Sequence, residues 1–576
     1  MFNRSRTLLL LFVVFMAGCV TSQQTASVAK PVNKPDKPVL PNVELTGKIL
    51  YDILLGEIAG YRGHLAISVT ALTSAAEKTR DPRLAERATL AAIYAKRYAE
   101  AGRNAALWVT LRPESAEAHS ALGMVMLETN NVEASIKHFR KVLQISTDKN
   151  ILKQRFIRIA AVLGHRRNRK SGLKIMRALV QAYPKEAGAQ YALAHLAVRV
   201  GDLDASLVAI NQALKIRPKW HEATLFKARI LISKKDPVRI QKFFEQALSD
   251  NPGASRLREN YARYLVDIKQ WEKALKQFKA VVRRVSNLKS LLYKRSVFAT
   301  GLLSIQVSNF TQAEKYLLMT LEVSPDNDQA RLYLGQVAER QDHFALAAKW
   351  YSKVRDTRYV FEAQVRYGVM LAKQGNLIAA RSHLHSIKPG SDQERIKLVL
   401  AEEQILRSEK KFKEALKVLT SALKLLPKNK ELLYARALVA ERLDKLDIHE
   451  RDIREILKQN PDNAHALNAL GYTLADKTNR YQEALKLIQR AMVLRPNDPF
   501  ILDSMGWVHY RLGKTKEAIQ YLRKALSIRA DAEISAHLGE ILWHQGKRGE
   551  ARSVWKKALR STPNNDALLD TIKKYK

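Results

Sequence analysis

The clearest internal repeat in the chain begins at residues 464–498, AHALNALGYTLADKTNRYQEALKLIQRAMVLRPND, and continues through residues 499–531, PFILDSMGWVHYRLGKTKEAIQYLRKALSIRAD. Both segments place an apolar residue and a glycine in their first half and small residues in their second half. Prolines keep a similar interval upstream, where Pro184, Pro218 and Pro252 are separated by 34 residues each. A period of this length predicts an array of one small unit.

The repeated positions match the tetratricopeptide pattern, in which each unit is a hairpin of two helices. Small residues such as Gly471 and Ala484 let the two helices approach closely, while Ile488 fills the space between neighbouring hairpins. Pro496 ends the second helix. Because each hairpin leaves an apolar face that only the next hairpin can cover, the sequence predicts an all-α solenoid.

About fourteen units are expected over residues 82–563. Short insertions break the register near residues 148–152 and 287–293. The expected unit starts are Pro82, Ala116, Lys153, Ala187, His221, Ser255, Lys294, Asp328, Phe361, Ile396, Lys430, Ala464, Pro499 and Ala532.

The two ends of an array of this kind need covering elements. Residues 564–576 are expected to form a C-terminal capping helix with one apolar face. Residues 45–81 are expected to form an additional helical hairpin that matches the pattern poorly and is very apolar. This hairpin is either a cap or a docking element for a partner.

The first 42 residues predict export and lipid attachment. Residues 1–18 combine arginines with a short apolar run, which is typical of a signal peptide and too short to span a bilayer. The sole cysteine, Cys19, directly follows small residues, as in a bacterial lipobox whose thiol carries diacylglycerol. Residues 19–42 are rich in Pro, Ser and Lys and predict an extended tether. Val20 after the cysteine favours the outer membrane, with the chain facing the periplasm.

Composition narrows the class of partner. The chain has 98 Lys and Arg against 56 Asp and Glu, a formal net charge of +42, which favours anionic partners or surfaces. One cysteine excludes a disulfide scaffold. An exported protein does not meet cytosolic nucleic acid, so we expect none as a ligand.

Motifs for catalysis or cofactors are not found. No His-Glu-x-x-His pair, nucleophile elbow or dinucleotide fingerprint is present. The segment Gly513-Lys514-Thr515 resembles the end of a phosphate loop but lacks the upstream glycine and falls where a helix–helix turn is expected. Lipidation would consume the Cys19 thiol. We therefore expect no enzyme activity, no metal and no cofactor.

The first helix of each repeat lines the groove of such an array, and this assigns two sets of candidate contacts. A basic set would suit carboxylates, acidic peptides or anionic glycan; its members are Arg87, Arg158, His195, Arg199, Arg229, Arg263, Arg366 and Arg407. A second set, in the last three repeats, is an aromatic strip with polar interruptions that would anchor an extended peptide; the alternative is packing between hairpins, above all for Trp543. This strip contains Asn468, Tyr472, Asp503, Trp507, Tyr510, Glu540, Trp543 and His544.

Two stretches, NALGYTLAD at 468–476 and LDSMGWVHYRLG at 502–513, carry a family resemblance together with HLGE at 537–540 and AERA at 85–88. With the lipobox and tether, the chain resembles a proteobacterial family of outer-membrane tetratricopeptide-repeat lipoproteins. The family includes the adaptor of a carboxyl-terminal processing protease.

The resemblance implies a non-catalytic adaptor that binds and activates a periplasmic serine protease of that type. It would present substrates such as peptidoglycan hydrolases to the protease. The strong basicity is not a feature of the family. Two alternatives stay open: a scaffold for an envelope secretion, pilus or polysaccharide-export machine, and a direct binder of anionic envelope glycan.

Overall fold

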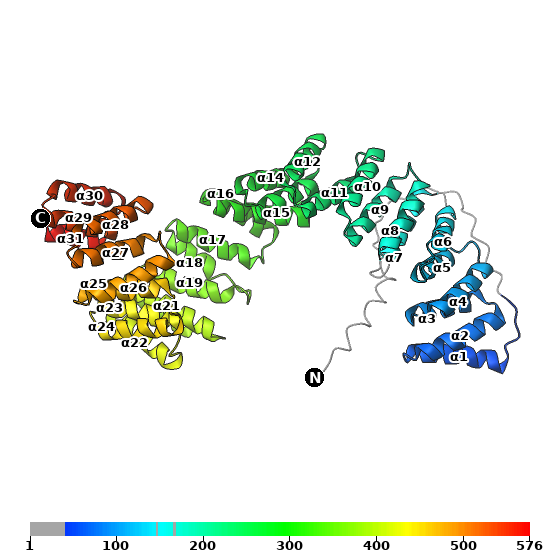
Figure 1. Cartoon of the computed structure of the whole chain (residues 1–576), viewed down its shortest axis with the longest axis horizontal. Helices are drawn as coiled ribbons and strands as arrows, with labels where there is room; N and C mark the ends of the chain where they lie inside the picture. Colours follow the sequence, from blue (N-terminus) through cyan, green and yellow to red (C-terminus); the bar gives the residue numbers. More distant parts are fainter. Residues whose placement is uncertain (1–40, 146–147, 165–168, 576) are drawn as a thin grey trace. The chain divides into compact units, whose positions relative to one another are not determined.

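The computed structural model describes residues 41–145, 148–164 and 169–575, and in these ranges all regular structure is helical (Figure 1). The expectation of an all-α array of tetratricopeptide hairpins is confirmed. The signal segment 1–18, Cys19 and all but the end of the tether 19–42 lie outside the described residues.

The chain divides into two compact units whose boundary lies after Gln241, inside helix α12 (Pro237–Asp250). Before α12, the first unit contains α1 (Gly47–Tyr61), α2 (Leu65–Thr79), α3 (Pro82–Tyr94), α4 (Tyr98–Leu111), α5 (Ala116–Glu128), α6 (Val132–Gln144), α7 (Lys149–Leu163), α8 (Arg169–Gln181), α9 (Ala187–Val200), α10 (Leu203–Ile216) and α11 (His221–Lys234).

The second unit is the longer one. Its helices after α12 are α13 (Ser255–Asp267), α14 (Trp271–Arg284), α15 (Leu291–Gln306), α16 (Phe310–Val323), α17 (Asp328–Arg340), α18 (Phe344–Tyr351), α19 (Val360–Lys373), α20 (Leu377–Ser386), α21 (Asp392–Ser408), α22 (Phe412–Leu425), α23 (Lys430–Arg442), α24 (Leu446–Gln459), α25 (Ala464–Lys477), α26 (Tyr481–Leu494), α27 (Pro499–Arg511), α28 (Thr515–Ile528), α29 (Ala532–His544), α30 (Arg548–Ser561) and α31 (Asp566–Lys574).

Ten of the fourteen expected unit starts coincide with the first residue of a helix. The other four helices, α7, α15, α19 and α21, begin one to four residues before the expected start. Helices α7, α15 and α21 have 15, 16 and 17 residues, so extra residues in the chain lengthen the first helix of the repeat. The insertion near 148–152 lies largely in α7, whereas that near 287–293 is divided between the loop before α15 and its first turn; both leave the hairpin pattern intact.

Close approach within a hairpin depends on small residues in its first helix. A Cβ atom on Gly506 of α27 would lie 2.7 Å from Cγ of Leu522 and 3.1 Å from the carbonyl oxygen of Ala518, both on α28. Gly471 of α25 is as close to Ile488 of α26, at 2.6 Å. These short distances explain why glycine recurs at this position, because any side chain there would push the two helices apart.

Turns and caps fix where the helices begin and end. Gly513 has a φ of +77° in the turn between α27 and α28, so the segment Gly513-Lys514-Thr515 is a helix–helix turn. Asn463 and Asp498 cap α25 and α27, each accepting hydrogen bonds from backbone N–H groups of the first turn.

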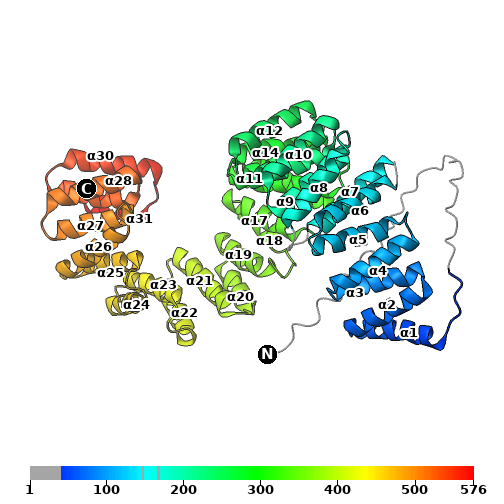
Figure 2. The same cartoon turned by 45° about the vertical axis from the view of Figure 1, so that its right-hand side comes forward.

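The two ends of the described array differ. At the C-terminus α31 packs on α29 and buries Leu568 completely. At the other end α1 and α2 form a hairpin that continues side by side into α3 and α4 (Figures 1 and 2). The outer face of α1 is apolar and open to solvent, whereas the outer face of a capping element is ordinarily polar; its exposed side chains are Leu50, Tyr51, Leu54, Ile58 and Tyr61.

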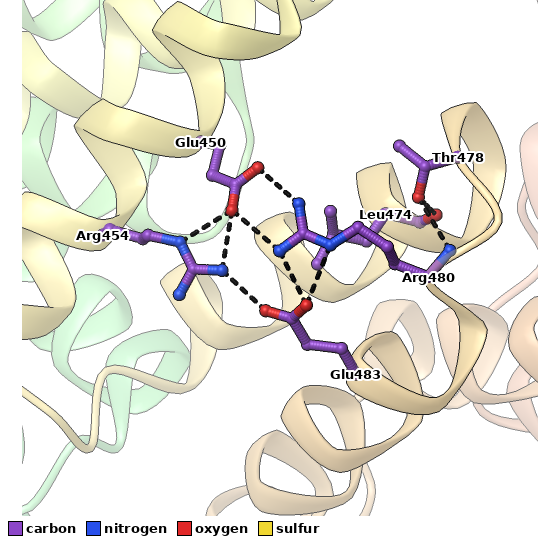
Figure 3. Close-up of polar contacts among 6 residues, drawn as sticks. All are labelled: Glu450, Arg454, Leu474, Thr478, Arg480 and Glu483. Carbon is purple, nitrogen blue, oxygen red and sulfur yellow. Dashed lines mark hydrogen bonds and ion pairs between the residues drawn. The ribbon is translucent and has the colours of Figure 1, made fainter.

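A closed ion-pair network joins two adjacent repeats of the second unit. Arg454 on α24 and Arg480, the residue before α26, each contact both Glu450 and Glu483 at 2.6–2.7 Å (Figure 3). Thr478 orders the turn that carries Arg480, because its hydroxyl donates to the Leu474 carbonyl and accepts from the Arg480 N–H (Figure 3). The network holds the second helices of the two repeats together.

Candidate functional site

The basic side chains predicted for the groove fall into two groups. Arg87 pairs with Glu57, Arg366 with Glu339 and Glu362, and Arg407 with Glu403. The charges of these three guanidinium groups are therefore paired with carboxylates of the same chain. Arg158, Arg199, Arg229 and Arg263 are exposed, and no carboxylate of the described residues lies within 4.0 Å of any of them.

Three of the unpaired arginines belong to consecutive repeats of the first unit. Arg158 lies on α7, Arg199 on α9 and Arg229 on α11, the first helices of their hairpins. These three helices together carry eight lysines and arginines and one acidic residue, Glu222. Arg263 lies on α13, in the second unit. We call Arg158, Arg199 and Arg229 the arginine face.

A layer of aromatic rings lies under the arginine face. His195 stacks on Phe226 with ring centroids 3.7 Å apart, and Tyr191 contacts both His195 and Trp220. Burial, together with the positive charges of Arg229 and Arg199, lowers the pKa of His195 to about 4. The imidazole is therefore neutral at pH 7, and its buried Nε2 has no hydrogen-bond partner.

Most side chains of the aromatic strip predicted in the last three repeats contact one another or a neighbouring repeat. Asp503 accepts from Nδ1 of His537 at 2.9 Å, and the Tyr472 hydroxyl lies 3.3 Å from Nε2 of the same ring. Trp507 stacks on His537 and donates its indole N–H to Asp476 at 3.1 Å. Asp503 and Trp507 are each only 7% exposed, so their side chains offer little surface to a partner.

His537 is the centre of this cluster and was not among the predicted contact residues. Burial alone lowers its pKa, but the charge of Asp503 and the hydrogen bond to it outweigh burial and raise the pKa above its ordinary value. The signal that would have found it is the spacing: Asp503 and His537 are separated by 34 residues, one repeat period. Residues so spaced occupy neighbouring hairpins at nearly the same height and can meet.

Three further members of the strip, Glu540, Trp543 and His544, lie on α29 near the C-terminal end of the array. The Tyr575 hydroxyl donates to Glu540 at 2.7 Å and lies 2.9 Å from Nε2 of His544. Trp543 packs against Trp555 and Tyr575. Trp543 therefore packs against the second helix of its own hairpin, α30, and against Tyr575, which follows α31. Tyr510 is half-buried beside Trp507, and Asn468 is half-buried with an unpartnered Oδ1.

Within the described residues, no group of three or more His, Cys, Asp or Glu side chains is placed to hold a metal ion. No helix there is both long enough and apolar enough to cross a bilayer. The chemistry available on the surface is that of charged, aromatic and aliphatic side chains.

Comparison with known proteins defines the class. Tetratricopeptide-repeat family models match residues 187–219, 298–359, 464–531 and 504–566. The chain belongs to the tetratricopeptide-repeat family, whose members are generally non-catalytic binding scaffolds.

Among individual relatives, the chain is similar to the TPR repeat-containing protein PA4667 of Pseudomonas aeruginosa, with 32% identity over 85% of this chain and 82% of that protein. It is also similar to the TPR repeat-containing protein YpiA of Bacillus subtilis, with 23% identity over 65% of this chain and 87% of that one. Among solved structures, the Cut9–Hcn1 hetero-tetramer of APC/C matches 92% of this chain and 96% of its own at 14% identity and a TM-score of 0.32.

Proposed function

We propose that the protein is an outer-membrane lipoprotein, anchored through Cys19, that binds and activates a periplasmic carboxyl-terminal processing protease. In this role it presents substrates such as peptidoglycan hydrolases to the protease. The order of parts supports the proposal: a lipobox-like cysteine, a tether and then a long repeat array. The stretches at 468–476 and 502–513 resemble the lipoprotein group that includes LbcA, the partner of the protease CtpA.

The observation that carries partner binding is the open apolar face of α1. Leu50, Leu54 and Ile58 recur at intervals of four along the helix and are 44–51% exposed. A row of aliphatic side chains on a terminal helix is costly to leave in water, and burying it against a partner is worth about 25 cal/mol for each Å² of apolar surface. We assign this face to the protease.

Activation of a purified protease tests the proposal. The full-length protein is expected to raise the rate at which a carboxyl-terminal processing protease degrades a protein substrate. The variant Leu50→Ala/Leu54→Ala/Ile58→Ala keeps strong helix formers in α1 while removing the apolar row. At least about tenfold more of this variant should be needed for the same activation. Truncating three contacts of about 0.5–1 kcal/mol each weakens binding to the protease by that factor.

A matched control is Ile378→Ala/Val493→Ala, which removes two side chains that are 85% and 82% exposed on α20 and α26. This variant should activate like the unaltered protein. Equal activation by the α1 variant and the control would remove α1 as the docking element. Failure of the unaltered protein to raise protease turnover would remove the adaptor role itself.

A further inference from the structure

The three guanidinium groups of the arginine face have no carboxylate partner among the described residues. Other groove arginines are matched by carboxylates from the same or the preceding repeat, as for Arg366 and Arg407, although Arg263 of α13 is not. The guanidinium groups of Arg158 and Arg229 make no hydrogen bond or ion pair with a described residue, and that of Arg199 reaches only the Ala161 carbonyl, at 3.5 Å. Three exposed guanidinium groups, on the first helices of three consecutive repeats, therefore have free N–H donors.

The contrast with the last three repeats shows that this charge is local. The corresponding first helices α25, α27 and α29 carry two basic and four acidic residues. A general excess of lysine and arginine over the chain would have given both regions the same sign. The first unit has a positive groove face that the end of the second unit lacks.

The surroundings of His195 point to the same surface independently. Its ring lies between Tyr191 and Phe226, and both Arg199 and Arg229 are close enough to disfavour its protonation. The guanidinium groups of Arg199 and Arg229 thus lie near one neutral, apolar ring. The nearby carboxylate of Glu222 is already bound by the Trp220 N–H and Lys153 and pairs with neither arginine. An anion bound across them would relieve their mutual repulsion and gain charge-assisted hydrogen bonds.

The ligand is further defined by the apolar side chains near the arginines in the structure and the sequence. Trp220 and Phe226 are 3% and 6% exposed, so their ring faces are covered and offer no open platform. Ile157 of α7 is 40% exposed and provides an aliphatic edge. The three guanidinium groups are spread over three helices, and an aliphatic side chain is exposed beside them in the sequence. This arrangement suits an extended chain that carries carboxylates at intervals.

We propose that the arginine face binds an extended protein segment rich in aspartate or glutamate. The contacts are ion pairs from Arg158, Arg199 and Arg229 to carboxylates of that segment. This inference goes beyond the adaptor function and does not depend on it, since the site lies on α7, α9 and α11 and the protease is assigned to α1.

The probe is a fluorescent octapeptide of glutamate, titrated with the full-length protein and followed by anisotropy. The test variant is Arg158→Ala/Arg199→Ala/Arg229→Ala. The control is Arg490→Ala/Arg523→Ala/Arg560→Ala, which removes the same net charge from the second helices α26, α28 and α30. An octapeptide of glutamine and an octamer of galacturonate accompany the glutamate peptide.

The proposal predicts that the glutamate peptide binds and the glutamine peptide does not. The arginine-face variant should bind at least about tenfold more weakly, as expected for loss of several charge-assisted contacts, while the control variant binds within about twofold of the unaltered protein. Raising the salt from about 0.05 to 0.3 M should weaken binding of the glutamate peptide steeply.

Three results would overturn the proposal. One is no binding of the glutamate peptide at low salt. Another is an equal loss in both triple variants, which would mean that only net charge matters. The third is tighter binding of the galacturonate octamer than of the peptide, lost in the arginine-face variant, which would make the surface a glycan site. Near-ultraviolet circular dichroism of both variants guards against loss of the fold.

Discussion

At the scale of single residues, the pair formed by His537 and Asp503 is the most consequential contact in the last repeats. The imidazole lies between Trp507 and Tyr472 and is linked through Nδ1 to a carboxylate of the preceding repeat. Because its pKa is raised in the folded protein, the protonated ring is bound more tightly there than in the unfolded chain. The pair therefore contributes stability that depends on pH.

The sign of that dependence is definite. The contribution of the pair is complete below the ordinary histidine pKa, about 6.5, and is lost as the pH rises through the raised pKa of His537. We expect the melting temperature to fall over this interval in the unaltered protein. Asp503→Asn should remove most of that fall and cost about 2 kcal/mol near pH 6, since it leaves the buried ring without its counter-ion.

Thermal melts at pH 6 to 9 for both proteins check this prediction, with Asp570→Asn as a control because Asp570 is an exposed carboxylate on α31. A pH-dependent fall of the same size in Asp503→Asn and in the unaltered protein would contradict it.

The same residues show how far sequence reasoning reaches. The spacing of Gly471, Gly506 and the prolines sufficed to predict the hairpins, because these residues act within one repeat. Whether Trp507 faces a partner or a neighbouring repeat depends on His537, one period further along the chain. Likewise Arg366 is neutralised by Glu339, 27 residues upstream. Contacts with neighbouring repeats determine whether a groove side chain is exposed. The pattern of one repeat does not reveal these contacts.

At the scale of the helical hairpin, Gly506 tests the packing argument. Alanine there gains about 1 kcal/mol of helix propensity but forces its Cβ against Leu522 and the Ala518 carbonyl. Overpacking of this kind costs about 1–3 kcal/mol, so the net change should be a loss of about 1 kcal/mol. Urea unfolding followed by circular dichroism measures it.

Gly549 is the matched control for that substitution. It lies in α30 and a Cβ atom there would meet nothing within 4 Å. Gly549→Ala should therefore be neutral or stabilising. If Gly506→Ala proves as stable as Gly549→Ala, close approach of α27 and α28 is not what requires the glycine.

The junction of two hairpins gives a second test, at the network of Glu450, Arg454, Arg480 and Glu483 (Figure 3). Arg480→Ala removes two of its ion pairs and should cost about 1 kcal/mol, a loss that shrinks at high salt because the side chain is partly exposed. Arg490→Ala, which breaks a single exposed pair with Asp462, should cost no more than about 0.3 kcal/mol. Equal losses in the two variants would show that the network is no stronger than an isolated surface pair.

At the scale of the whole molecule, the described surfaces differ in chemistry. The open face of α1 is apolar, the arginine face of α7, α9 and α11 is positive, and the first helices of the last repeats are closed by contacts among themselves. The sequence predicted the helical array and the helices at both of its ends. It did not predict which groove side chains lack ion-pair partners. The helices that carry the three unpaired arginines contain eight basic residues and one acidic residue, so they combine ordinary basicity with few carboxylates.

Crosslinked pull-down from bacterial envelopes tests the proposed role as an adaptor for a carboxyl-terminal processing protease. The full-length lipidated protein should recover a serine protease of that type. The variant Leu50→Ala/Leu54→Ala/Ile58→Ala should recover far less of it, and Ile378→Ala/Val493→Ala should recover the same amount as the unaltered protein. Recovery of secretion, pilus or polysaccharide-export components without any such protease would contradict the account.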